Sequence, residues 1–220
     1  SVDEGITPAL DCLHASMSIL SGALSTMEMS LKEVSDGFYA LKRSIGDPDA
    51  MYAAMQSLSA SFRELSAAVN AASQDISALI DSLYNDGTYY YDTFLTALRD
   101  NLTQLNDDLA AVSEGFAGLG EAVRESIATG DKAPVEAALT ELSEAIRASA
   151  DSLYGAIHAF TYLGEGMKKM LEDLHIAIPG INADLSALGT ALGNVSGAIS
   201  SVIGEMDVRA LSEALGDFGA

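Results

Sequence analysis

The stretch that decides the fold is residues 6–45, ITPALDCLHASMSILSGALSTMEMSLKEVSDGFYALKRSI. Apolar residues recur in it at alternating steps of four and three. At the chain's 49% hydrophobic background, twelve successive apolar positions in a fixed register arise by chance roughly two times in ten thousand. A helix places this spacing on one face, so we predict a helix over about 8–45. Its apolar seam is Ile6, Leu10, Leu13, Met17, Leu20, Leu24, Met27, Leu31, Val34, Phe38, Leu41 and Ile45.

Residues that favour the start or the end of a helix flank the first seam, and further seams of this kind follow along the chain. Thr7 and Pro8 suit the start of the first helix, and Gly46 suits a left-handed cap at its end. The fourth seam is less regular and passes through Ala150. Pro179 lies inside the last strict seam, where proline should break or kink a helix. The expected helices are approximately 8–45, 48–84, 89–129, 133–178, 180–204 and 208–216.

The connections between the expected helices are short, which favours antiparallel neighbours. The positions that flank the first seam carry small side chains, so each helix should contact two neighbours within one chain. We therefore predict an all-α fold: residues 1–220 form one elongated antiparallel bundle of four long helices and a shorter C-terminal helical segment, with coiled-coil-like packing. An intermolecular coiled coil is the alternative. The flanking residues are Ala9, Ser16, Ala23, Ser30, Gly37 and Ser44.

The net charge of the chain limits the classes of partner that it can bind. The chain has 32 acidic and 11 basic residues, a formal net charge of −21, which would repel nucleic acid and anionic lipid. The run from Leu185 to Gly204 has no ionisable residue, yet Ser, Thr, Asn and Gly fill half of it. We therefore expect no nucleic-acid partner and no direct membrane insertion by this chain.

Two features of the sequence are candidate contact sites. Gly189, Gly193 and Gly197 recur every four residues, and this spacing predicts close helix packing. Membrane insertion, as in a helical pore-forming toxin, is the alternative reading of that stretch. The second feature, which we call the tyrosine tip, is Tyr84, Tyr89 and Tyr90 around a predicted turn. Tyrosines at the end of a bundle suit partner contact, and packing of the tip itself is the alternative.

Catalytic signatures are missing from the sequence, so we predict no enzyme and no cofactor. Asp11 precedes His14 by three residues, and Glu172 precedes His175 in the same way, a spacing that some helical metal sites use. Leucines hold the core positions in both segments, which leaves these histidines on the flank. We therefore predict no metal site.

Three segments carry a resemblance to a known family: Val34-Ser35-Asp36-Gly37, Val112-Ser113-Glu114-Gly115 and the run from Leu185 to Gly204. They resemble the Leu-x-x-Gly heptad style of the extracellular region in phage infection protein (Pip)-type membrane proteins of Gram-positive bacteria. The resemblance implies a cell-surface location, with membrane helices outside this sequence; a cytoplasmic location is the alternative. It also implies a spacer or docking role.

Our leading expectation is thus a non-enzymatic helical segment that binds an unidentified protein, as a monomer or homodimer. The alternatives are a ligand-sensing receptor bundle and the pore-forming toxin. A sensor would need polar residues that point into the bundle, and the seams offer almost none.

Overall fold

The computed structural model describes residues 3–85, 92–173, 179–205, 209 and 213, and this part of the chain is helical apart from short turns. Five helices follow one another: α1 (Asp3–Ser44), α2 (Pro48–Asn85), α3 (Asp92–Thr129), α4 (Ala133–Asp173) and α5 (Pro179–Glu205). The predicted all-α helical bundle is confirmed. At 1.5 Å per residue, the 42 residues of α1 extend about 60 Å.

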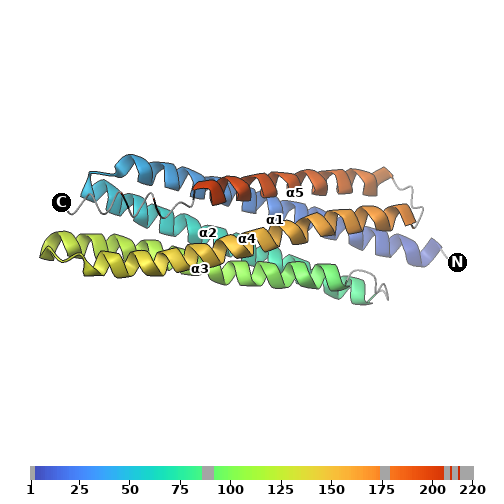
Figure 1. The fold of residues 1–220 in the computed structure, drawn as a ribbon. Coiled ribbons are helices and arrows are strands. Elements are labelled where there is room, and N and C mark those ends of the chain that lie inside the picture. Colours follow the sequence, from blue (N-terminus) through green and yellow to red (C-terminus); the bar gives the residue numbers. More distant parts are fainter. Residues whose placement is uncertain (1–2, 86–91, 174–178, 206–208, 210–212, 214–220) are drawn as a thin grey trace.

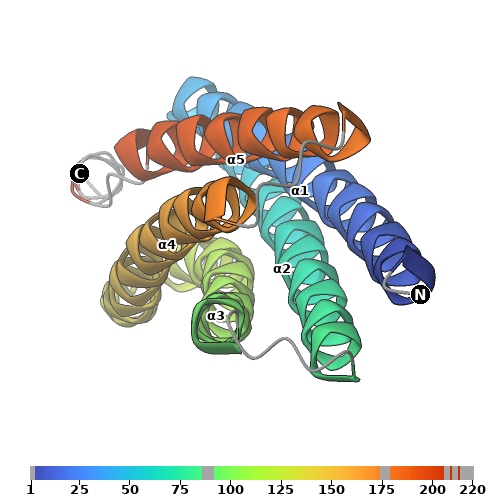
Figure 2. The ribbon, with the colours of Figure 1, turned by 90° about the vertical axis from the view of Figure 1, so that its right-hand side faces the viewer.

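The helices form a closed ring in which each packs against two neighbours (Figures 1 and 2). Consecutive helices from α1 to α4 run antiparallel, and α5 completes the ring between α4 and α1. α5 runs in the same direction as α1, and Ser35 Oγ of α1 donates a hydrogen bond to Glu205 Oε2 at the end of α5, at 3.1 Å. The contact between α4 and α5 is the least extensive of the five. The expectation of two neighbours for each helix is therefore confirmed.

The connection between α1 and α2 has the glycine cap that the sequence predicts. Gly46 adopts a positive φ of 101°, which a glycine tolerates without steric cost. Asp47 then caps α2, because its Oδ1 accepts a hydrogen bond from the Ala50 amide at 3.2 Å. Pro179 begins α5, so the expected break at this residue is confirmed.

The predicted start of α1 is wrong, because the helix begins at Asp3 and includes Pro8. Proline disrupts only the turn that precedes it, and here that is the first turn of the helix. The predicted segment 208–216 lies almost wholly outside the described residues, as do the turn at 86–91 and the residues 174–178.

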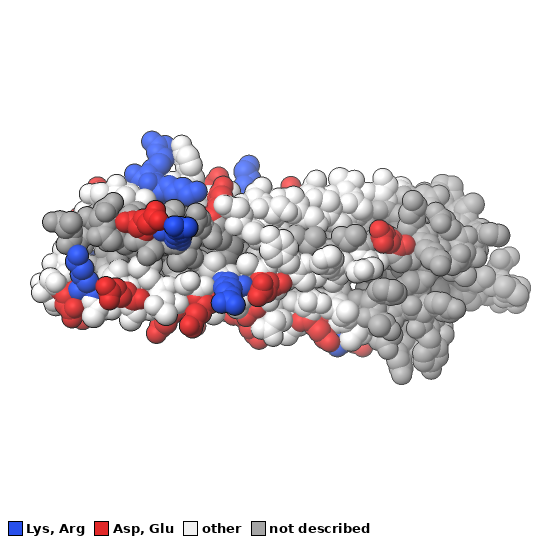
Figure 3. Space-filling model, in the orientation of Figure 1, with Lys and Arg blue, Asp and Glu red and all other residues white. Residues whose placement is uncertain are grey.

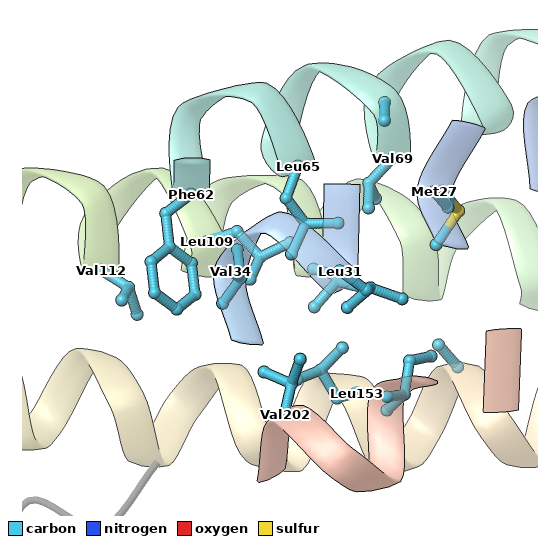
Figure 4. Close-up of a cluster of buried hydrophobic side chains, with 14 of the residues drawn as sticks. Met27, Leu31, Val34, Phe62, Leu65, Val69, Leu109, Val112, Leu153 and Val202 are labelled. Carbon is cyan, nitrogen blue, oxygen red and sulfur yellow. The ribbon is translucent and has the colours of Figure 1, made fainter. Parts of the chain in front are cut away.

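The core follows the predicted seams along the ring. Figure 4 shows side chains of all five helices meeting there, among them Leu31, Leu65 and Val202. Two seam residues near helix ends are exposed, Ile45 at 43% and Ile127 at 52%, because no neighbouring helix covers them. In α4 the structure buries Ser149 where the predicted seam has Ala150, which is half-buried. The irregular step in that seam is therefore a shift of one residue in the buried face.

The segments Val34–Phe38 and Val112–Phe116 hold equivalent places in the hairpins α1–α2 and α3–α4. In each, a glycine lets the next helix approach closely: a Cβ on Gly37 would lie 2.7 Å from Leu58 Cδ1, and one on Gly115 would lie 2.9 Å from Leu142 Cδ1. The phenylalanine that follows each glycine enters the core. Phe38 and Phe116 have ring centroids 5.7 Å apart and both contact Phe62 of α2.

Candidate functional site

The tyrosine tip falls mostly outside what the structure describes. Tyr84 belongs to α2, but its side chain is not among the described ones, and Tyr89 and Tyr90 lie outside the described residues. The tip therefore stays a prediction.

A line of buried serines joins α2 to α3, and we call Ser59, Ser66 and Ser73 the serine ladder. Ser59 Oγ donates to the Ser113 carbonyl and Ser113 Oγ to the Ser59 carbonyl, both at 2.7 Å. Ser66 Oγ lies 2.7 Å from Asn106 Oδ1, and Ser73 Oγ lies 3.0 Å from Thr103 Oγ1. The ladder thus replaces apolar contact with hydrogen bonds that fix how α2 and α3 align.

The ladder qualifies the expectation that almost no polar side chain faces into the bundle. Its hydroxyls are tied to the neighbouring helix, so they fill space and leave no site for a ligand. The signal that could have found it is the recurrence of serine every seven residues, each directly after a seam residue: Leu58, Leu65 and Ala72. Ser149 is different, because its buried hydroxyl has no hydrogen-bond partner among the described residues.

A polar cluster lies outside the ladder near the first turn of α2. The Tyr52 hydroxyl donates to Glu121 Oε1 at 2.6 Å, and Arg124 Cζ lies 4.1 Å from the Tyr52 ring centroid. This hydrogen bond to Glu121, with burial, raises the pKa of Tyr52 above its ordinary 10.0. The cluster ties α2 to α3 at an exposed position.

Acidic residues crowd the contact between α1 and α2. Glu33 of α1 shares a hydrogen bond with Glu64 of α2, and this bond, with repulsion from Glu64 and Asp36, raises the pKa of Glu33 above its ordinary 4.5. Among the described atoms, Figure 3 shows a largely uncharged surface over the middle of this face of the molecule, where α5 lies. The described surface of α5 therefore carries little of the chain's charge.

The glycines of α5 do not pack as predicted. Gly189, Gly193 and Gly197 are exposed, and a Cβ on any of them would have no atom within 4 Å. The prediction of close helix packing at these glycines is wrong, because α5 turns the opposite face, Leu188, Leu192, Val195, Ile199 and Val202, into the core. Within the described residues, Ser186–Glu205 is the one stretch long and apolar enough to cross a membrane, with a mean hydropathy of 1.2 and 28% of it buried.

A groove of about 670 Å³ separates Gly193 and Gly197 of α5 from α1, and we call it the α1–α5 groove. Leu31 contributes to its lining, and Met29, 67% exposed, lies at its edge. The sequence reading missed this groove, although an apolar Met29 outside the seam was a signal for it. The other residues on its two sides are Ser25, Glu28, Lys32 and Ser35 of α1, and Gly193, Asn194, Gly197, Ala198 and Ser201 of α5.

The histidine motifs lie mostly outside what the structure describes. His14 is exposed, the side chains of Asp11 and Glu172 are not described, and His175 lies outside the described residues. No group of three His, Cys, Asp or Glu side chains that could hold a metal ion occurs among the residues that the structure covers.

Comparison with known proteins gives no relative: no family model, no curated protein and no solved structure matches the chain.

Proposed function

We propose that this chain is a non-enzymatic, extracellular helical-bundle segment of a membrane-associated protein, where it serves as a spacer or as a docking surface for another protein. The observation that supports this most is the closed ring of five helices around one continuous apolar core. A bundle about 60 Å long whose interior is filled holds its two ends at a set separation, as a spacer requires.

The contacts inside the bundle favour a rigid spacer over a ligand-sensing bundle. The serine ladder binds its hydroxyls to the facing helix, and three phenylalanine rings fill the centre of the bundle. The cell-surface location rests on the resemblance to the Leu-x-x-Gly style of Pip-type proteins, and the strongly acidic composition is compatible with it.

Location is tested by labelling a cysteine at an exposed site in intact cells. Gly118 is exposed with open space around it, so Gly118→Cys in a Cys12→Ser background presents one accessible thiol. A membrane-impermeant maleimide is expected to label this thiol in intact cells that express the full-length gene. Labelling only after lysis would contradict an extracellular location, and the Cys12→Ser chain alone controls for background.

The sensor alternative has its own measurement. A screen of small metabolites by thermal shift is expected to show no stabilising compound if the bundle is a spacer. Reproducible stabilisation by one compound would favour a ligand-sensing bundle, because a ligand that binds the folded state raises its melting temperature.

One observation favours the pore-forming alternative as a second candidate. The apolar stretch Ser186–Glu205 is only 28% buried, so α5 could meet a bilayer without first leaving a deep core. Dye release from neutral phosphatidylcholine vesicles at micromolar protein would support this candidate, and intact vesicles would rule it out.

A further inference from the structure

The α1–α5 groove has both a projection and a hollow on one surface. Met29 projects from α1 at 67% exposure, and the hollow of the groove lies beside Gly193 and Gly197, which have no side chains to fill it. A flexible methionine side chain adapts well to an irregular surface. A second surface with the same two features would therefore fit this one by exchanging projection for hollow.

The charged residues beside the groove would also match the same residues on a second copy of the chain. Only Glu28 and Lys32 carry charge among its lining residues, and they lie one helical turn apart on α1 with opposite sign. In the described part of the chain neither makes an ion pair with another residue. The midpoint between them lies level with the centre of the groove, since its lining runs over residues 25–35 of α1 and 193–201 of α5.

We propose that the α1–α5 groove is the contact surface of a homodimer with a twofold axis over its centre, close to Gly197. A twofold contact is isologous, so residue i of one copy meets residue j of the other and the reverse. The axis then places Met29 of each copy in the hollow of the second copy. It also places Glu28 of one copy opposite Lys32 of the other, in two equivalent pairs.

Charge selects a second copy as the occupant over an oppositely charged protein. Two chains of net charge −21 repel each other across most of their surfaces. Residues 185–204 have no Asp, Glu, Lys or Arg, and residues 12–27 of the parallel helix α1 have none either. These two stretches let two acidic copies approach with little repulsion, whereas a basic protein would gain more by binding the acidic surfaces elsewhere.

The expected contact is small. The exposed length of α5 over residues 186–204 is about 28 Å, and two adjacent helix surfaces of about 10 Å each give roughly 600 Å² per copy. A standard stable interface buries about 800 Å² per partner. The dimer should therefore be weak and reversible, and added salt should strengthen it by screening the remaining like charges.

Sedimentation equilibrium of the 220-residue chain over about two decades of concentration tests the proposal. Wild type is expected to show a monomer–dimer equilibrium. Gly197→Leu should raise the dimer dissociation constant at least about tenfold, because its side chain would fill the hollow beside the axis. Gly118→Leu is the matched control, since Gly118 is an exposed helical glycine with open space on α3, and it should leave the equilibrium unchanged.

A charge exchange tests the geometry independently of packing. Lys32→Glu should weaken the dimer, because two pairs of like charges then face each other, and Glu28→Lys with Lys32→Glu should restore it. A wild-type chain that stays monomeric at every concentration, or a Gly197→Leu chain that dimerises as wild type does, would overturn the proposal. Flotation of monomeric protein with neutral phosphatidylcholine vesicles would instead identify a lipid surface as the occupant, and that result also overturns it.

Discussion

Phe116→Ala tests whether the bundle depends on one aromatic cluster. Phe116 of α3 is fully buried, and its ring centroid lies 5.7 Å from those of Phe62 in α2 and Phe38 in α1. Truncating a buried phenylalanine costs about 3–5 kcal/mol through lost burial and the cavity that remains. Each aromatic pair adds about 0.5–1.5 kcal/mol, so we expect a loss near 5 kcal/mol. Domains are stable by only about 5–15 kcal/mol, so this is a large fraction of the total.

Urea unfolding followed by circular dichroism measures this loss. The midpoint should fall while the slope m stays constant, because the surface exposed on unfolding barely changes. Tyr154→Ala is the matched control: this aromatic side chain on α4 is 54% exposed, and its loss should change stability by no more than about 0.5 kcal/mol. A loss below about 2 kcal/mol for Phe116→Ala would refute the aromatic cluster as the centre of the core.

Three further substitutions probe the contacts between helices. Gly115→Ala should destabilise the protein in urea titrations, since its methyl would meet Leu142 at 2.9 Å, whereas Gly118→Ala should gain up to about 1 kcal/mol of helix propensity; equal effects would contradict this. Ser113→Ala should cost about 0.5–1.5 kcal/mol, because it removes the hydrogen bond that Ser113 Oγ donates to the Ser59 carbonyl, and the double change Ser59→Ala/Ser113→Ala should cost less than the sum of the two single changes, because the two hydroxyls also lie 3.2 Å apart. The raised pKa of Glu33 means that its protonated form favours folding, and this contribution is lost as pH rises through its titration. Glu33→Gln should therefore raise the melting temperature near pH 7 and leave it unchanged near pH 4, and an equal shift at both pH values would argue against the shared proton.

The core could be predicted because burial in a long helix follows a local period. From Met17 to Leu41, every predicted seam residue of α1 is at most 6% exposed. The seam residues of α2 are fully buried: Met51, Met55, Leu58, Phe62, Leu65, Val69, Ala72 and Ile76. Where the period slips, at Ala150, the buried residue is instead its neighbour Ser149. Two seam residues at helix ends, Ile45 and Ile127, are exposed, because burial there depends on how far the neighbouring helix extends.

The candidate sites were harder to predict because they depend on which helices become neighbours. Small residues permit close approach of another helix but do not require it, so Gly193 and Gly197 could equally well be packed or exposed. The serine ladder has the same origin: a seven-residue repeat of serine is compatible with solvent unless a facing carbonyl lies within reach. Met29 became meaningful only once α5 was placed beside α1.

The outer face of α5 is the feature that the monomer explains least. Its inner face follows the same four-and-three spacing as the other helices, so packing accounts for Leu188, Leu192 and Val195. Solvation would favour charged residues on the opposite face, as in ordinary surface helices. The chain instead has its longest uncharged run there, although acidic residues are abundant elsewhere. An uncharged outer surface beside an exposed methionine makes physical sense if another molecule covers it, and two copies of an acidic chain are the molecules for which the missing charge matters most.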